Sequence, residues 1–411
     1  MLNAFDFAPL LRPDVPAPTA RYTGFPKYNF VGGHNDPVST PVEALRMAAD
    51  AVLRREGRDL ATYGLASGPQ GYLPLRKFLV RKLRAHAGMA CTADEVLITS
   101  GSLQGLDLVN ALLLSPGDTV LIEADCYSGS ITRLQRAGAS IVGVPLDQQG
   151  MRMDALAAIL ADLKRGDVRP KYIYSIPTIQ NPNGSVLSLQ RREQLLQLAG
   201  DYGVPVFEDE CYADLVFDGQ RPPALFALAR SRGWDGVIHI GSFSKSIAPA
   251  LRVGYVVAPW DVIARLLALK QDAGSGALEQ MVLAEFCAAH FDAHVTALNA
   301  ALKRKADVLV AALAEHFGTA AEFDAPCGGI FLWVTLPEAV DTTRLAVLAA
   351  EAGIAINPGA EWSVAGTGAR RRLRLCFANP TPEIIRDGVA ALASVCQREF
   401  GVPARIGNVA G

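Results

Sequence analysis

The 411-residue sequence lacks the features that mark several classes of protein. Its charges nearly cancel, with 39 basic and 41 acidic residues, so no basic excess indicates nucleic-acid binding. No apolar run approaches the roughly 20 residues that a transmembrane helix needs. The N-terminal residues show no basic segment followed by an apolar stretch, so we expect no signal peptide.

Cysteine is also scarce, and its arrangement argues against disulfides or a metal cluster. The seven cysteines are odd in number, and none forms a Cys-x-x-Cys pair. We therefore expect free thiols and a cytoplasmic protein. His290 and His294 have the i, i+4 spacing of some metal ligands, but no third ligand accompanies them, so no metal site is predicted.

The composition is that of a folded protein with more than one structural unit. Half of the residues are hydrophobic and 19% are charged, which allows a sizeable core. The length predicts two or three units. Seven of the 25 prolines fall within the first 41 residues, so this segment is predicted to be an extended arm that lies over another surface, with a partner subunit as one candidate.

Amphipathic helical patterns alternate with short apolar runs from about residue 55 onward. The runs are rich in Val and Ile and show little polar alternation, which is typical of strands buried on both faces of a parallel sheet. These predicted strands are 96–99, 119–123, 140–145, 172–176, 205–208, 237–241 and 252–257. A long helical pattern at 276–316 follows, and predicted strands at 329–335 and 372–377 with two helices form an α+β unit.

Chemically useful side chains follow the ends of four predicted strands. In an open parallel sheet, ligands bind beyond the carboxyl ends of the strands. The groups found there are a Ser-Gly-Ser turn at 100–102, Asn181, Asp209 with Tyr212, and Lys245 with Arg252. A glycine turn that opens a helix suits a phosphate, since the first backbone N–H groups of the helix are free. The pattern predicts a phosphorylated cofactor with a lysine beside it.

The order and spacing of these motifs resemble one family along nearly the whole chain. The motifs are Tyr63-Gly64, Gly71-Tyr72-Leu73-Pro74-Leu75-Arg76, Thr99-Ser100-Gly101-Ser102, Gln180-Asn181-Pro182-Asn183-Gly184, Glu208-Asp209-Glu210-Cys211-Tyr212, Ser242-Phe243-Ser244-Lys245 and Arg374-Leu375-Cys376-Phe377. Together they resemble the fold-type-I pyridoxal 5′-phosphate enzymes of aminotransferase class I/II. Within these, the sequence is most similar to the branch of 2-aminoadipate and kynurenine aminotransferases.

The resemblance implies an α/β fold, the pyridoxal-phosphate-dependent transferase fold type I. Its large domain holds a mainly parallel seven-stranded sheet with one antiparallel strand, beside a smaller α+β domain. We assign 1–54 to an N-terminal arm and part of the small domain, 55–290 to the large domain that binds pyridoxal phosphate, and 291–411 to the small C-terminal domain. The resemblance also implies a homodimer with shared active sites.

The same resemblance implies the catalytic residues. Lys245 would form the Schiff base with pyridoxal 5′-phosphate and later carry the proton at the substrate Cα. Asp209 would pair with the pyridinium nitrogen and keep it protonated. Asn181 and Tyr212 would donate hydrogen bonds to the 3′-oxygen of the cofactor ring.

The remaining predicted contacts concern the phosphate, the cofactor ring and the substrate. The phosphate would lie among Gly101, Ser102, Ser242 and Arg252, with Tyr63 reaching it from the neighbouring subunit. Tyr127 would stack on the ring. Arg374 would bind the substrate α-carboxylate with its bidentate guanidinium, together with Asn181. Gly33 would let the arm pass over the substrate.

These residues predict an aminotransferase that moves an amino group between an L-amino acid and a 2-oxo acid with ping-pong kinetics. Another pyridoxal-phosphate reaction on an amino acid, such as β- or γ-elimination, cyclisation or oxidation, stays open. The sequence does not identify the substrate, because Leu103 and the arm segment at 32–37 depart from the commonest family pattern at positions that face it. A transcription regulator is disfavoured, because the Pro-rich N-terminal segment does not resemble a helix-turn-helix.

Overall fold

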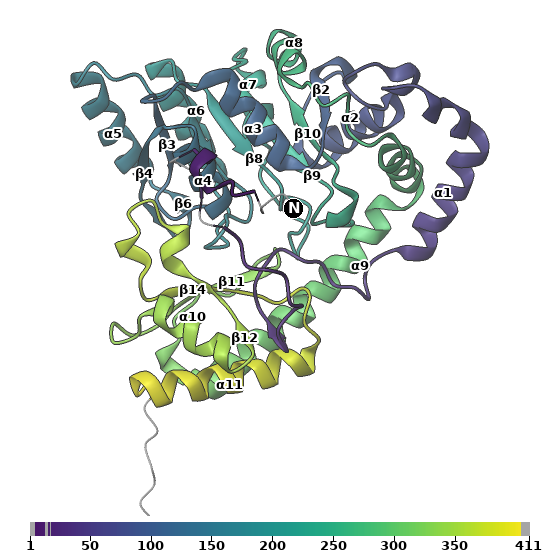
Figure 1. Cartoon of the computed structure of the whole chain (residues 1–411). Coiled ribbons are helices and arrows are strands. Elements are labelled where there is room, and N and C mark those ends of the chain that lie inside the picture. Colours follow the sequence, from purple (N-terminus) through teal and green to yellow (C-terminus); the bar gives the residue numbers. More distant parts are fainter. Residues whose placement is uncertain (1–4, 13–14, 17, 404–411) are drawn as a thin grey trace, which may run out of the picture.

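The computed structural model describes residues 5–12, 15–16 and 18–403, so part of the predicted arm, at 1–4, 13–14 and 17, lies outside the described residues. A seven-stranded sheet forms the larger part of the molecule (Figure 1). Its strands, in spatial order, are β2 (Val96–Thr99), β10 (Gly254–Val257), β9 (Val237–Ser242), β8 (Val206–Asp209), β7 (Ile173–Ser175), β3 (Thr119–Glu123) and β4 (Ser140–Val144). Only β10 runs antiparallel to its neighbours in this sheet. The predicted mainly parallel sheet with one antiparallel strand is confirmed.

Helices cover both faces of this sheet, because successive strand residues point to opposite sides. In β2, Leu97 packs into one core while Val96 and Ile98 pack into the other. The core around Leu97 includes α3 (Ser102–Leu113), α4 (Ser128–Arg136) and α8 (Trp260–Leu269). The opposite core includes α2 (Leu73–Ala87), α5 (Met153–Arg165), α6 (Leu189–Tyr202) and α7 (Leu225–Ser231).

A three-stranded antiparallel sheet forms the centre of a second, smaller part of the molecule. Its strands are β11 (Phe331–Thr335), β14 (Arg372–Cys376) and β13 (Asn357–Pro358), in that spatial order. This small sheet packs with α10 (Thr342–Glu351) and α11 (Pro382–Phe400) around a core of its own. The arm joins the same part, since β1 (Tyr28–Asn29) pairs with β12 (Ile354–Ala355).

The long helix α9 (Ala277–Phe317) connects the two parts without a break (Figure 1). Met281 lies in the core of the large sheet, whereas Leu302 lies in the core of the small sheet. The helix α1 (Val42–Glu56) precedes α2, and a short hairpin of β5 (Leu146–Asp147) and β6 (Gly150–Met151) follows β4. The predicted boundary at residue 290 therefore falls inside a continuous helix.

Several details differ from the sequence analysis, including the ends of several strands. The strand predicted at 252–257 begins only at Gly254, because Arg252 has a left-handed backbone (φ 54°) at the end of the turn Pro249–Leu251. The helices α7 and α8 were not predicted, and α7 spans only seven residues, too few for a clear helical period. None of the helices in the described part of the chain combines the length and apolar character that a bilayer crossing requires.

Candidate active site

A cavity of about 310 Å³ lies beyond the carboxyl ends of the parallel strands, where the large sheet faces the small one. Parallel strands end at one edge of a sheet, so residues distant in sequence meet there. All but two of the predicted site residues line the cavity. They are Gly33, Ser102, Tyr127, Asn181, Asp209, Tyr212, Ser242, Lys245, Arg252 and Arg374.

Lys245 follows β9 and points to the arm. Its Nζ donates a hydrogen bond to the carbonyl oxygen of Gly33 at 2.8 Å and lies 6.0 Å from the centre of the Tyr212 ring. A Cβ atom added to Gly33 would overlap with this amine, so the Lys245 side chain would have to move aside for any larger residue. Burial lowers the pKa of Lys245, and the cations Arg374 and Arg252 act in the same direction. The amine is therefore easier to deprotonate than an exposed lysine.

Asp209 is the last residue of β8 and lies buried on the floor of the cavity. Its Oδ2 accepts a hydrogen bond from the Tyr174 hydroxyl at 2.6 Å, and its Oδ1 accepts one from the Cys211 amide at 3.1 Å. Burial raises the pKa of Asp209, although these donors oppose the shift. A fixed carboxylate in this position can bind a cationic ring nitrogen through a charge-assisted hydrogen bond.

One end of the cavity is suited to an anion. Gly101 has φ 77° and precedes α3, whose first backbone N–H groups have no partner within the helix. The Arg252 guanidinium lies against Gly101 so closely that a Cβ atom there would overlap with it, and Arg252 Nη2 donates to the Ser100 carbonyl at 3.3 Å. Ser102 and Ser242 add hydroxyl groups to the same cavity. Free N–H groups, hydroxyls and a guanidinium are ligands for a phosphate.

Arg374 reaches the cavity from β14 on the small sheet. Its Nη1 donates to Asn181 Oδ1 at 2.9 Å, and its Nη2 donates to the Gly32 carbonyl at 3.0 Å. The guanidinium carbon lies 3.9 Å from the centre of the Trp362 ring and 5.2 Å from that of Phe331. No carboxylate in the described part of the chain pairs with this buried cation, so a carboxylate ligand would complete it.

Aromatic rings form the remaining walls. Tyr127 caps α4, and its ring lies 6.1 Å from the ring of Trp362. Tyr212 packs edge-on against Phe331 at 5.2 Å, and burial raises the pKa of its hydroxyl well above the ordinary value. A planar ring could therefore bind between polar ends and against aromatic faces.

Two predicted site residues do not line the cavity. Gly101 lies behind Arg252 and makes room for it, as described above. Tyr63 is 89% exposed on the surface of this chain. It was predicted to reach the site of a neighbouring subunit, and that prediction stays untested. His294, one of the two histidines rejected as a metal ligand, bonds the carbonyl oxygen of Ser246 at 2.8 Å.

The residues of the site that the sequence analysis missed include Tyr174, Asn357 and Trp362. Tyr174 lies within β7 rather than after it, so the strand-end rule does not point to it. Asn357 and Trp362 belong to the small sheet and the turn beyond it, and both line the cavity. Only the folded chain brings them beside Arg374, and no motif in the sequence indicates that proximity.

Comparison with known proteins agrees with this geometry. The family model described as aminotransferase class I and II matches residues 30–392. A 2-aminoadipate transaminase of Thermus thermophilus is 36% identical over 89% of this chain and 88% of its own length. An aromatic-amino-acid aminotransferase of Thermococcus litoralis is 30% identical over 90% of this chain and 88% of its own length.

A solved structure gives the same result. The α-aminoadipate aminotransferase of Thermus thermophilus, complexed with N-(5′-phosphopyridoxyl)-L-leucine, superimposes with a TM-score of 0.83 at 35% identity. The match covers 90% of this chain and 92% of that one. The sequence left open whether the protein catalyses transamination or another pyridoxal-phosphate reaction. These relatives are aminotransferases, which favours transamination. The chain belongs to the class I and II aminotransferases and is a pyridoxal-phosphate-dependent aminotransferase with the fold of type I.

Proposed function

We propose that the cavity around Lys245 is the active site, and that it exchanges the amino group of an L-amino acid for the oxygen of a 2-oxo acid. One observation carries the proposal: a lysine with a lowered pKa, a buried carboxylate and a buried, carboxylate-free guanidinium meet in one cavity. They come from three distant segments, at Lys245, Asp209 and Arg374. A cofactor aldehyde, a cationic ring nitrogen and a substrate carboxylate would each find a partner there.

The residues present fit pyridoxal 5′-phosphate. Lys245 would hold its aldehyde carbon, Asp209 its ring nitrogen, and Asn181 with Tyr212 its ring oxygen. The phosphate would bind at Ser102, Ser242 and Arg252, where Gly101 leaves space for the guanidinium. When bound, this cofactor supplies an electron sink for the pair left on Cα when its proton departs.

The chain's own groups would then perform the proton transfers and the positioning. Because burial lowers the pKa of Lys245, its amine is more readily present as the free base, which can accept the α-proton and return it to the product. Arg374 would hold the substrate carboxylate. Its Nη1 also donates a hydrogen bond to Asn181 Oδ1, which would orient the Asn181 side chain toward both cofactor and substrate. The aromatic walls limit the water that reaches the reacting carbon.

We further propose a cytoplasmic homodimer in which each chain contributes to its partner's site. Large apolar side chains are exposed along the N-terminal segment, including Phe5, Leu10 and Phe25, and Tyr63 is 89% exposed. A second copy that covers this segment would remove the apolar surface from water. All seven cysteines are free, which agrees with a reducing compartment.

The domain division proposed from the sequence has support in the separate hydrophobic cores. The two cores on the faces of the large sheet lie within the segment assigned to 55–290, apart from a few residues of α1 and α9. The core of the small sheet contains Phe30 from the arm and residues from 298 onward, but also a few from the loops around 179 and 212–216. We propose that the two domains meet within α9, close to residue 295.

A spectroscopic titration tests the function. The purified protein should carry a visible absorption band of bound cofactor. Amino acids would then be added singly, including 2-aminoadipate, aromatic amino acids and leucine, because the relatives' names and ligand contain them. A productive donor should abolish the band, and a 2-oxo acid should restore it. Release of ammonia without need for an acceptor would contradict transamination.

The Lys245→Ala variant tests the assignment of the lysine. It should lose the band of covalently held cofactor and roughly 10²–10⁴-fold or more of the half-reaction rate, because it lacks the proton carrier. Lys303→Ala is a matched control, since Lys303 pairs with Asp307 on the exposed face of α9 and does not line the cavity. Retention of both band and rate by Lys245→Ala would refute the assignment.

A further inference from the structure

Three unpartnered hydrogen-bond donors gather at the carboxylate end of the active-site cavity. They are Arg374 Nε, Asn357 Nδ2 and Trp362 Nε1, which are shielded from solvent and have no partner among the described residues. All three residues line the cavity. Buried donors without partners are uncommon in folded proteins, so a cluster of them around one cavity requires an explanation.

The backbone holds these donors side by side. Asn357 lies directly opposite Arg374 in the antiparallel pair of β13 and β14, so the two side chains leave the same face of the small sheet. Trp362 follows in the next turn and is 3% exposed, with its ring 3.9 Å from the guanidinium carbon of Arg374. The Asn357 and Trp362 side chains therefore lie beside the Arg374 side chain rather than at separate places.

The charge at this end is also unbalanced. The acceptors on Arg374 Nη1 and Nη2 are an amide oxygen and a backbone carbonyl, which are neutral. A buried donor without a partner loses its hydration and gains nothing in return. An anion with several acceptor lone pairs would satisfy the unpaired donors and the charge together, and a carboxylate offers about four such sites.

We infer that Asn357 and Trp362 act with Arg374 as donors to the substrate α-carboxylate and thereby restrict the enzyme to substrates that carry one. The inference rests on the proposed function of this cavity, and it names two residues beyond the guanidinium. Amines that lack the carboxylate would leave all three donors unpaired in the complex. Loss of a hydrogen-bond partner in this way discriminates strongly between otherwise similar substrates.

The first experiment measures carboxylate binding without turnover. Isothermal titration calorimetry would follow 4-methylpentanoate, 3-phenylpropanoate and glutarate binding to the cofactor-loaded enzyme and to variants. Trp362→Phe retains a ring against the guanidinium but removes the N–H group, and Asn357→Leu replaces the amide with an apolar group of similar size. Each should weaken binding about tenfold to a hundredfold, since a hydrogen bond to a charged group is lost.

A control variant tests whether the loss of a different indole of the small sheet also weakens carboxylate binding. Trp333→Phe removes another indole of the same sheet. Trp333 lies opposite Arg374 in the pair of β11 and β14, but it lines a second cavity, which also contains Arg372, and not the active-site cavity. This variant should bind the carboxylates like the wild type. Asn357→Asp should be weaker than Asn357→Leu, because a second carboxylate would repel the ligand.

The second experiment compares two substrates. The half-reaction rate would be measured for the best amino-acid donor and for the amine that differs only by the missing carboxylate. Asn357→Leu and Trp362→Phe should raise KM for the amino acid while changing the amine rate and the cofactor band little. Equal losses with both substrates would show a structural role and overturn the inference, as would unchanged carboxylate binding in both variants. If no amino acid alters the band, the proposed function fails, whereas the calorimetry still decides this inference.

Discussion

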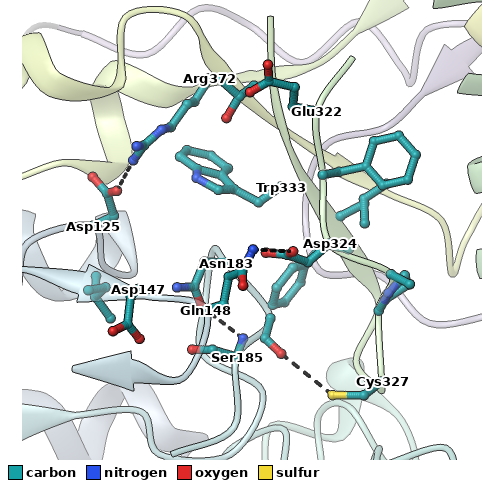
Figure 2. A pocket seen from close by; sticks show the side chains of 18 of the residues that line it. Asp125, Asp147, Gln148, Asn183, Ser185, Glu322, Asp324, Cys327, Trp333 and Arg372 are labelled. Carbon is teal, nitrogen blue, oxygen red and sulfur yellow. Dashed lines mark hydrogen bonds and ion pairs between the residues drawn. The ribbon is translucent and has the colours of Figure 1, made fainter. Parts of the chain in front are cut away.

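The active-site cavity has a larger neighbour, and the two differ in how their polar groups are paired. The second cavity, of about 460 Å³, also lies between the large and small sheets (Figure 2). Arg372 forms an ion pair there with Asp125, and Gln148 Nε2 donates to Asp324 at 3.1 Å. Among the described residues that line this second cavity, Ser185 Oγ is the one buried polar side-chain atom without a hydrogen-bond partner. In the active-site cavity, by contrast, Arg374 and its neighbours keep several donors free.

Volume alone does not single out the proposed active site, since the second cavity is the larger of the two. Two arginines on the same strand, Arg372 and Arg374, face different cavities. Arg372 is neutralised by a carboxylate that follows β3, so its interaction ties the two sheets together. Arg374 has only neutral partners and is buried, so it is available to a ligand. The unpaired buried charge distinguishes the binding site from the structural contact.

The loop that begins at Gln180 separates the cavities. Asn181 lines the active-site cavity, whereas Asn183 lines the second one. Gln180 Nε2 anchors this loop by donating to Glu123 Oε2 at 3.0 Å and to the Asp125 carbonyl at 2.8 Å. The part of the loop that lines the proposed cofactor site is therefore held by contacts that lie outside that cavity.

After the loss of Lys245, the largest fall in rate is expected for a change at Asp209, which lies buried at the bottom of the active-site cavity. Asp209→Asn keeps the shape of the side chain but removes its charge, so the ring nitrogen of the cofactor would lose its anionic partner. We expect the half-reaction rate to fall roughly 10²–10³-fold, because charge that develops in the reaction loses its stabilisation. Stopped-flow spectroscopy of the half-reaction measures the loss. A rate close to that of wild type would remove Asp209 from the mechanism.

Tyr174→Phe provides a graded companion to that variant. The phenol donates to Asp209 Oδ2, and its removal leaves the carboxylate in place but less firmly oriented. We expect a loss of roughly tenfold, the effect of one hydrogen bond to a charged group. A loss as large as that of Asp209→Asn would mean that Tyr174 does more than position the carboxylate.

Glu123, which accepts a hydrogen bond from Gln180 in the loop between the cavities, should make the stability of the protein depend on pH. Burial raises the pKa of Glu123 from 4.5 to about 7, although Gln180, Ser175 and the Ile176 amide oppose the shift. The folded state thus holds this proton more tightly than the unfolded state. The contribution is fully present below pH 4.5, falls as pH rises, and is lost above about pH 7, a span of about 3 kcal/mol.

The Glu123→Gln variant removes that titration. The free energy of unfolding of wild type relative to the variant should fall between pH 5 and pH 8, and urea unfolding at both values measures it. The difference between the two proteins isolates Glu123 from all other titrating groups. A difference that is equal at pH 5 and pH 8 would contradict the raised pKa.

The smallest effect is expected for the ion pair between Arg372 and Asp125 in the second cavity. Arg372→Gln breaks the ion pair with Asp125, and the Arg372 side chain is 35% exposed. Partly exposed pairs contribute about 1 kcal/mol or less, so we expect a small change in stability and a KM within about threefold of wild type. Arg374→Gln, two residues along the same strand, should raise KM for amino acids by about a hundredfold or more. Similar KM values for the two variants would refute the distinction between the cavities.

Much of the large sheet could be predicted from the sequence. The strands β2 and β3 have the predicted bounds, because uninterrupted apolar runs end at turns that contain Gly, Ser, Pro or Asp. The site residues after those strands could be predicted as well, since the carboxyl ends of parallel strands meet at one edge. The start of β10 was wrong by two residues, because Arg252 has a left-handed backbone at the end of the turn Pro249–Leu251, which the apolar pattern of the sequence does not indicate.

The sequence by itself determined the alternation of strands and helices, the edge at which Asp209 and Lys245 meet, and the family. Local hydrophobic periodicity and turn residues carry that information. Only the tertiary structure decided which arginine is neutralised and which is free, and that Asn357 and Trp362 lie beside Arg374. Pairing of charges and burial of donors depend on contacts between segments far apart in the chain. Neither composition nor local pattern records such contacts, so they appear only when the two sheets pack together.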